Sequence, residues 1–152
     1  MEPWLFEEVA DVVLGVVPTG LGPARVQSRR FGVKLWFGAE APAREHYEAQ
    51  VIGPQHVEGA KVLALEIGFH AEGRSADANE ELVARLLQRE DRWRAVLGDG
   101  AVIGPFLGRQ AAWRRLSETW PDPDLSAPDV AIDIGVRLGE YVAALEPILR
   151  AR

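Results

Sequence analysis

The chain has 152 residues, a formal net charge of −6 and no cysteine. A chain of this length forms one domain with a substantial core, and without thiols it has no disulfide framework, thiolate metal site or cysteine nucleophile. The acidic balance argues against the broad positive surface of a nucleic-acid-binding protein. Charges, glycine or proline interrupt every apolar stretch before the roughly 20 residues of a membrane span, so we expect a soluble, cytoplasmic protein. The preference for arginine over lysine favours a bacterial source.

The first segment predicts a helix over residues 3–17. Pro3 suits a first helical turn, and Glu7 and Glu8 suit the positive end of the helix dipole. These acidic residues, with no basic leader before them, distinguish the segment from a signal peptide. The apolar positions follow the helical period at Leu5, Val9, Val12, Val13 and Val16.

Three segments alternate apolar and polar residues and predict half-buried strands. They are Val26–Phe37, Glu45–Gly53 and Val62–Ala71, which together form an antiparallel meander. The register follows from the apolar face, because a slip of one residue would expose that whole face. The predicted neighbours are Tyr47 with Leu35 and Phe69, Ala49 with Val33 and Ile67, Lys34 with Glu48, Trp36 with His46, and His46 with His70.

A second helix follows the meander, starting at Ser75 or Asp77 and continuing to Leu97, with Asp77 and Glu80 as a capping box. Residues 101–120 suit a second short hairpin, although Trp113, Leu116 and Trp120 fit either period. Ser126 and Asp129 then predict a further capping box before a long last helix. The apolar stripe of that helix comprises Val130, Ile134, Leu138, Tyr141, Leu145 and Ile148.

The elements predict a single α+β domain over residues 1–152. We expect an antiparallel meander sheet of three strands plus a second hairpin, packed on one face by three helices. This order of elements resembles the secretion-chaperone-like α/β fold, whose members are mostly small dimeric binding proteins. The resemblance covers the whole chain but contains no residue motif, so it implies a dimeric binding protein and no particular activity.

The outer face of the predicted sheet gathers His46, Glu48, Glu66 and His70, with Glu72 nearby. Two imidazoles and a carboxylate suit a zinc or iron ion and leave a position for water. His46, His70 and Glu66 are therefore the predicted metal ligands. Glu48 is a possible base in a metal-dependent hydrolase. The alternative is an ordinary solvated face, on which Lys34 and Glu48 form a cross-strand ion pair.

Two further features suggest binding surfaces. Trp36 with Arg30 and Lys34 could stack a base or ring, unless Trp36 packs under a loop. A stripe of small residues on the last helix, spaced by four, could form a homodimer seam, or could let the helix cross its own sheet under aromatic residues such as Phe31 or Phe69. The stripe comprises Ala131, Gly135, Gly139 and Ala143.

These features favour a non-catalytic binding or adaptor domain that is homodimeric, engages a protein or a small ligand and binds no stoichiometric metal. Its ligand-binding residues would be Trp36, His46, Glu48 and His70. The alternative is a small metal-dependent hydrolase with its His/Glu site on the outer sheet face. The sequence favours binding because it contains no second convergent set of catalytic groups.

Overall fold

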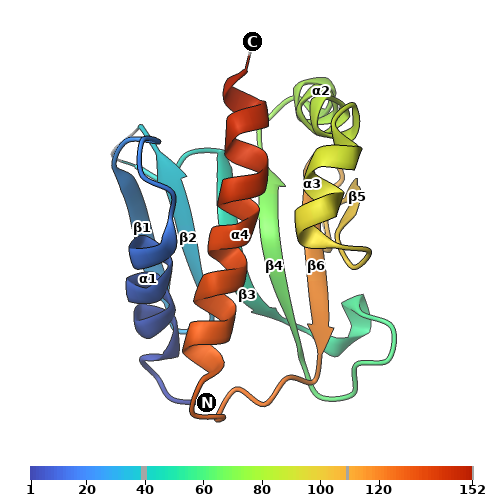
Figure 1. Cartoon of the computed structure of the whole chain (residues 1–152). Helices are drawn as coiled ribbons and strands as arrows, with labels where there is room; N and C mark the ends of the chain where they lie inside the picture. Colours follow the sequence, from blue (N-terminus) through green and yellow to red (C-terminus); the bar gives the residue numbers. More distant parts are fainter. Residues whose placement is uncertain (39–40, 109, 152) are drawn as a thin grey trace.

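The computed structural model describes residues 1–38, 41–108 and 110–151, within which four α-helices pack against an antiparallel sheet of six strands (Figure 1). The predicted α+β class is confirmed. The helices are α1 (Leu5–Val16), α2 (Ala76–Leu87), α3 (Glu90–Leu97) and α4 (Val130–Arg150), with a short 3₁₀ helix, η1 (Pro54–His56). The strands are β1 (Ala24–Arg29), β2 (Gly32–Phe37), β3 (Glu45–Ile52), β4 (Ala64–Ala71), β5 (Val102–Pro105) and β6 (Arg114–Pro121).

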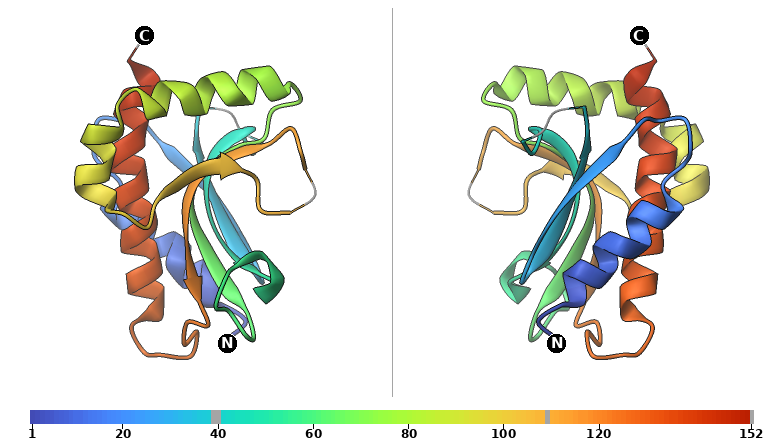
Figure 2. Two further views of the ribbon diagram at one scale, coloured as in Figure 1. Left: turned by 90° about the vertical axis from the view of Figure 1, so that its right-hand side faces the viewer. Right: turned by 90° about the vertical axis from the view of Figure 1, so that its left-hand side faces the viewer.

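The strands lie in the order β1-β2-β3-β4-β6-β5. Helices α1, α3 and α4 lie on one face of the sheet, and α2 crosses its upper end (Figure 1). Figure 2 shows the other face, which we call the outer face, with η1 and the loop between β5 and β6 projecting from it. The sheet therefore has a helix-covered face, which holds the apolar core, and an outer face flanked by two loops.

The predicted register is confirmed for the central strands, and so is the second hairpin, formed by β5 and β6. The pairing of β2 with β3 ends at Leu35 and Tyr47, and Trp36 pairs instead with Arg25 of β1. The confirmed pairs are Leu35 with Tyr47, Tyr47 with Phe69, Val33 with Ala49, Ala49 with Ile67, Lys34 with Glu48, and His46 with His70.

The prediction of one strand over residues 26–37 is wrong. The chain reverses at Arg30 and Phe31, so the segment forms the hairpin of β1 and β2. Val26 pairs with Leu35 across this hairpin. Apolar and polar residues therefore alternate both before and after the turn, so the sequence pattern does not indicate where the chain reverses. Phe31 lies at the turn and is 54% exposed, whereas continuation of the strand would have buried it.

The prediction of one helix from Ser75 or Asp77 to Leu97 is also wrong, because the backbone leaves the helical path at Gln88 and Arg89. The indole nitrogen of Trp93 in α3 donates to the Leu86 carbonyl at the end of α2, 2.7 Å away. The same carbonyl accepts from the backbone N–H of Arg89 at 3.0 Å, so two bonds hold the junction between the helices. The break turns Trp93 into the core, where it is fully buried.

Neither predicted capping box forms. Ser75 caps α2, since its hydroxyl accepts from the Ala78 N–H, while the Glu80 carboxylate binds Arg114 at 2.6 Å. Before α4, the backbone N–H of Ser126 donates to Asp124, and Asp129 makes no capping bond. The Glu80 carboxylate and the Ser126 N–H, which the capping boxes would have used, are thus each bonded to another residue.

The glycines of α4 are explained by α1. A Cβ at Gly135 would lie 2.6 Å from Val12 Cβ, and one at Gly139 would lie 2.6 Å from Val16 Cγ2. The expected crossing of the sheet under Phe31 or Phe69 is therefore not what these glycines permit; they lie against α1, on the same face of the sheet (Figure 1). Self-association through Ala131, Gly135, Gly139 and Ala143 stays a prediction; of these four, Ala143 is exposed.

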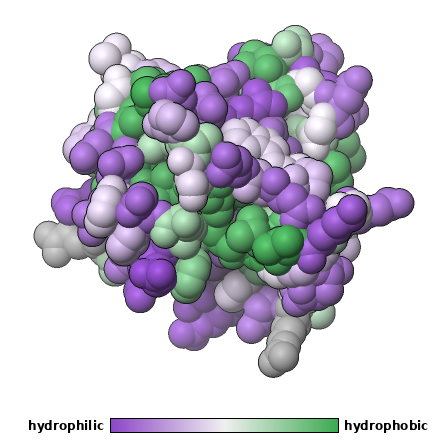
Figure 3. Space-filling model, turned by 90° about the horizontal axis from the view of Figure 1, so that it is seen from below, coloured by the Kyte–Doolittle hydropathy of each residue, from purple (hydrophilic) through white to green (hydrophobic). Residues whose placement is uncertain are grey.

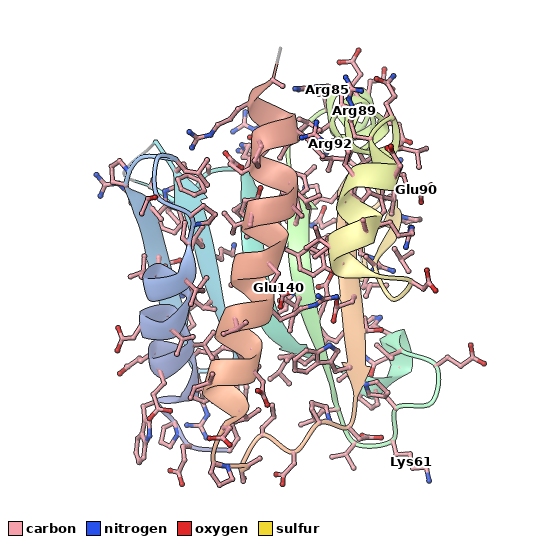
Figure 4. The ribbon with its side chains drawn as sticks, viewed as in Figure 1. Lys61, Arg85, Arg89, Glu90, Arg92 and Glu140 are labelled. Atoms are coloured by element: carbon pink, nitrogen blue, oxygen red, sulfur yellow. The ribbon has the colours of Figure 1, made fainter. Side chains whose placement is uncertain are left out.

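A polar network joins α4 to β6 and α3 on the helix-covered face. Tyr141 Oη donates to Glu118 Oε1 at 2.8 Å, and Arg137 forms an ion pair with the same oxygen at 2.7 Å. Arg137 also donates to the Leu97 carbonyl and pairs with Glu140, which Figure 4 labels on α4. Glu118 thus fixes α4 on the sheet, and it belongs to the face opposite the histidines.

The surface mixes apolar and polar groups. Seen from below, the end of the molecule where α4 begins has hydrophobic groups near its centre, surrounded by hydrophilic ones (Figure 3). Within the described residues, no helix combines the length and the apolar character that a membrane crossing needs.

Candidate metal centre

The outer face brings two histidines and two glutamates together at the ends of β3 and β4. His46 and His70 are directly opposed on these antiparallel strands, so both imidazoles leave the sheet on the same side. Glu48 follows His46 by two residues, and Glu72 follows His70 by two. We call His46, Glu48, His70 and Glu72 the His–Glu cluster; all four residues are buried.

Four donor atoms of the cluster converge on one point. His46 Nε2 lies 2.8 Å from Glu48 Oε1 and 3.3 Å from Glu72 Oε2. His70 Nδ1 lies 3.3 Å from Glu48 Oε1 and 3.1 Å from Glu72 Oε2. Nitrogen and oxygen therefore alternate around a ring. These four distances are close to the about 3.3 Å between neighbouring donors of a tetrahedral zinc site with bonds of about 2.0 Å, and all four donor atoms lie within 4.8 Å of one another.

The other nitrogen of each imidazole already has an acceptor. His46 Nδ1 lies 2.9 Å from the Ala43 carbonyl oxygen, which can only accept, so Nδ1 carries a proton. His70 Nε2 lies 3.0 Å from Glu66 Oε2. These bonds orient both rings with His46 Nε2 and His70 Nδ1 toward the centre of the cluster. Metal-binding histidines are held in this way by carbonyl or carboxylate acceptors.

Glu66 is itself fixed by two neighbouring strands. Its Oε2 accepts from the Ser117 hydroxyl at 2.7 Å, and its Oε1 accepts from the Gln50 amide at 2.9 Å. Arg115 donates in turn to the Ser117 hydroxyl. Glu66 therefore holds His70 on the side away from the other three members of the cluster.

Gly68 allows β6 to approach β4 closely enough for these bonds. A Cβ at Gly68 would overlap the Leu116 carbonyl oxygen and Ser117 on β6. Gly68 pairs with Glu48 on one side and with Ser117 on the other. A larger residue would push Ser117 away from Glu66, so we interpret this glycine as part of the support of the cluster.

The cluster strongly favours charged carboxylates and, in the metal-free protein, charged imidazoles. Burial acts to lower the pKa of His46 and His70, but the glutamates around them outweigh it and raise both pKa values above 6.5. Burial acts to raise the pKa of the glutamates, but the imidazoles outweigh it. The pKa falls to about 2 for Glu66 and Glu72, and below its usual value for Glu48.

An aromatic pair from the second hairpin covers part of the cluster. The Phe106 ring lies edge-on to His70 with centroids 4.8 Å apart, and Trp113 contacts Phe106 at 5.1 Å. Asn79 of α2 anchors the same loop by donating to the Ala112 carbonyl, and it binds both the N–H and the carbonyl of Gly73 beside Glu72. Trp120 lies apart from this site, since its indole donates to Glu118.

Of the three predicted metal ligands, two point to the centre of the cluster and the third does not. His46 and His70 face its centre, whereas Glu66 contacts His70 from the opposite side. Glu72, which the sequence placed near the site as the next residue in the alternation after His70, takes the position expected for Glu66. The Lys34–Glu48 ion pair does not form among the described residues, although the two are paired in register.

Trp36 is placed differently from the predicted stacking strip. It is 4% exposed and lines a recess with Ala43, Glu45 and Tyr47, so its ring is covered rather than offered to solvent. Phe106 and Asn79 were not identified from the sequence. Their role depends on how the loop after β5 folds, and no local pattern indicates that path.

The His–Glu cluster could hold one divalent ion through two nitrogens and two oxygens. Imidazole nitrogen and carboxylate oxygen suit zinc, iron(II) and manganese(II), with additional positions open when the ion is five- or six-coordinate. Because both inner nitrogens must lose their protons, metal binding would release protons.

Comparison with known proteins adds no family. No protein-family model, curated protein or solved structure matches the chain. The resemblance to the secretion-chaperone-like fold therefore stays a prediction, and any function must be argued from the site.

Proposed function

We propose that this protein is a non-catalytic binding domain that holds a divalent transition-metal ion in the His–Glu cluster and uses it to engage a ligand. One observation carries the proposal. His46 Nε2, His70 Nδ1 and one oxygen each of Glu48 and Glu72 face the same point, while the outer nitrogens are already bound by Ala43 and Glu66. One nitrogen of each imidazole is thus held by an acceptor while the other is directed at carboxylate oxygens, which is the arrangement of metal-binding histidines.

Burial strengthens this argument. The side chains of His46 and His70 are 1% and 0% exposed. The four residues of the His–Glu cluster and Glu66 are all buried. Burial costs several kcal/mol for each charge that is not paired, and apolar residues at these positions would often give equal or greater stability. A metal ion supplies a reason to retain them, because it neutralises the carboxylates and takes both inner nitrogens as ligands.

The test is direct measurement of bound metal. Purified chain is stripped with a chelator, and Zn²⁺ or Co²⁺ is titrated in by calorimetry, with elemental analysis of the dialysed product. We expect one ion per chain. His70→Ala and the isosteric Glu72→Gln should both lose stoichiometric binding, whereas His56→Ala should retain it.

Glu72→Gln keeps the shape of the side chain, so a correctly folded variant separates loss of a ligand from loss of the fold, which circular dichroism monitors. A wild-type chain that stays metal-free under these conditions contradicts the proposal. Equal metal binding by wild type and a folded Glu72→Gln variant contradicts this ligand set.

A metal-dependent hydrolase is the second candidate, because a cleft reaches Glu48 and Glu72 from solvent and could admit water to the ion. In the proposed coordination, however, Glu48 is a ligand and is not available as the base. Within the described residues, the glutamates that line the cleft are Glu48 and Glu72 themselves. The base predicted from the sequence is thus used as a ligand, and this is why we favour binding without hydrolysis; His56, on the wall of the same cleft, is the remaining candidate base. Turnover of a simple ester by the zinc-loaded chain, lost in Glu72→Gln, would favour the hydrolase instead.

A further inference from the structure

Among the residues that the structure describes, the His–Glu cluster reaches solvent through its two glutamates. The histidine side chains are essentially inaccessible, whereas those of Glu48 and Glu72 are 11% and 12% exposed. Both glutamates line a cleft of about 400 Å³ on the outer face. Any group that binds the metal from solution must therefore enter past these two carboxylates.

The walls of this cleft differ in chemistry. Strand β2 contributes Lys34 and η1 contributes His56, while the loop between β5 and β6 contributes Phe106, Leu107 and Trp113. Figure 2 shows η1 and this loop projecting on the same face of the sheet. The cleft thus offers one ammonium group and a wall of apolar and aromatic side chains beside the candidate metal ion.

The charges select the kind of ligand. A divalent ion with two glutamates and two neutral imidazoles carries no net charge, and Glu66 is compensated through Ser117 by Arg115. The Lys34 ammonium makes no hydrogen bond or ion pair with any residue in the described part of the chain, although it lines the cleft with Glu48. One uncompensated positive charge suits a monoanion, whereas a phosphate dianion would bring a second negative charge against the glutamates.

We propose that the cleft binds a small organic carboxylate, whose oxygen coordinates the metal ion and pairs with Lys34 while its apolar body contacts Phe106 and Trp113. This inference rests on the proposed metal site. A carboxylate suits both partners, because it is a hard oxygen ligand for the ion and a charge-assisted hydrogen-bond acceptor for an ammonium. Phe106 has a double role in this arrangement, since it also covers His70.

The experiment uses the full chain loaded with Co²⁺, whose visible absorption spectrum reports its coordination. Benzoate is titrated as the probe, with benzamide as its neutral analogue and inorganic phosphate as the dianionic alternative. We expect benzoate to change the spectrum at a lower concentration than benzamide or phosphate does. Lys34→Met should weaken benzoate binding by about tenfold, as expected for loss of one charge-assisted hydrogen bond, and Lys34→Arg should restore most of it.

Lys61→Met is the matched control, because it removes the same charge at the lower end of the molecule, where Lys61 projects from the surface (Figure 4). Co²⁺ affinity is measured for every variant, so that a weaker response to benzoate is not mistaken for loss of the ion. Wild-type chain that binds Co²⁺ but responds equally to benzoate and benzamide overturns the inference alone. Tighter binding of phosphate overturns the carboxylate class. Failure to bind Co²⁺ overturns the metal site as well.

Discussion

The imidazole of His70 uses both of its nitrogens. Nδ1 faces Glu48 and Glu72, and Nε2 faces Glu66, so three carboxylates surround one fully buried ring. At the scale of single residues, the site is therefore defined by orientation as much as by residue type. Glu66 is the group that sets this orientation, since its oxygens are themselves fixed by Gln50 and Ser117.

Replacement of Glu66 by glutamine tests this positioning role. The amide keeps the size of the side chain but removes the charge that favours a proton on His70 Nε2. We expect Zn²⁺ affinity to fall by about 10- to 100-fold, as is typical when the partner of a ligating histidine is removed. Stoichiometry should stay at one ion, because the cluster ligands remain. Glu58→Gln removes the same charge from an exposed loop and serves as the control. Equal Zn²⁺ affinities of the Glu66→Gln and Glu58→Gln variants would contradict the positioning role of Glu66.

At the scale of elements, two contacts decide how the sheet is covered. The helix pair α1 and α4 shields one face and approaches most tightly at Gly135, and the β5–β6 hairpin brings Phe106 over the other. Within the sheet, Gly68 plays a part like that of Gly135, because it allows β6 to lie close to β4. Glycine thus sets one helix–helix distance and one strand–strand distance.

Gly135→Ala should destabilise the protein despite the better helix propensity of alanine. The added methyl would meet Val12 Cβ at 2.6 Å and the Val9 carbonyl at 3.2 Å, and neither atom can move without the backbone of α1. We expect a loss of about 1–3 kcal/mol in the free energy of unfolding, the usual cost of overpacking. Urea denaturation measures it.

Gly139→Ala is the matched comparison in the same helix. Its methyl would meet the tip of Val16, which is 44% exposed and can rotate away. This variant should be neutral or gain up to about 1 kcal/mol from helix propensity. Equal effects of the two substitutions would show that contact with α1 is not what requires Gly135.

For the whole molecule, pH acts on stability through the same buried groups. The fold raises the pKa of His46 and His70 above 6.5, so their contribution is fully present below pH 6.5 and is lost as pH rises through the folded-state values. Glu66 and Glu72 act in the opposite sense. Their pKa falls from 4.5 to about 2, so their contribution is present above pH 4.5 and is lost as pH falls toward 2.

The metal-free protein should therefore be most stable between pH 4.5 and 6.5. Urea midpoints measured in chelator at about pH 2.5, 5.5 and 8.5 should be highest at the middle value. His70→Gln removes one of the two raised imidazoles, so the fall from pH 5.5 to 8.5 should become smaller. A wild-type midpoint that rises steadily to pH 8.5 would contradict this account of the cluster.

The sequence by itself determined the α+β class, the central register and the pairing of His46 with His70, because alternation and burial of one face leave a single consistent pairing of β3 and β4. Local pattern could not reveal the turn at Arg30, where both strands carry the same alternation, or the break at Arg89, which a core contact of Trp93 requires. Only the tertiary structure decided the chemistry of the outer face. Strand alternation does not specify which nitrogen of each histidine points inward. Contacts between residues far apart in the chain bring Glu72 to His46, fix Glu66 on Ser117 and place Phe106 over His70.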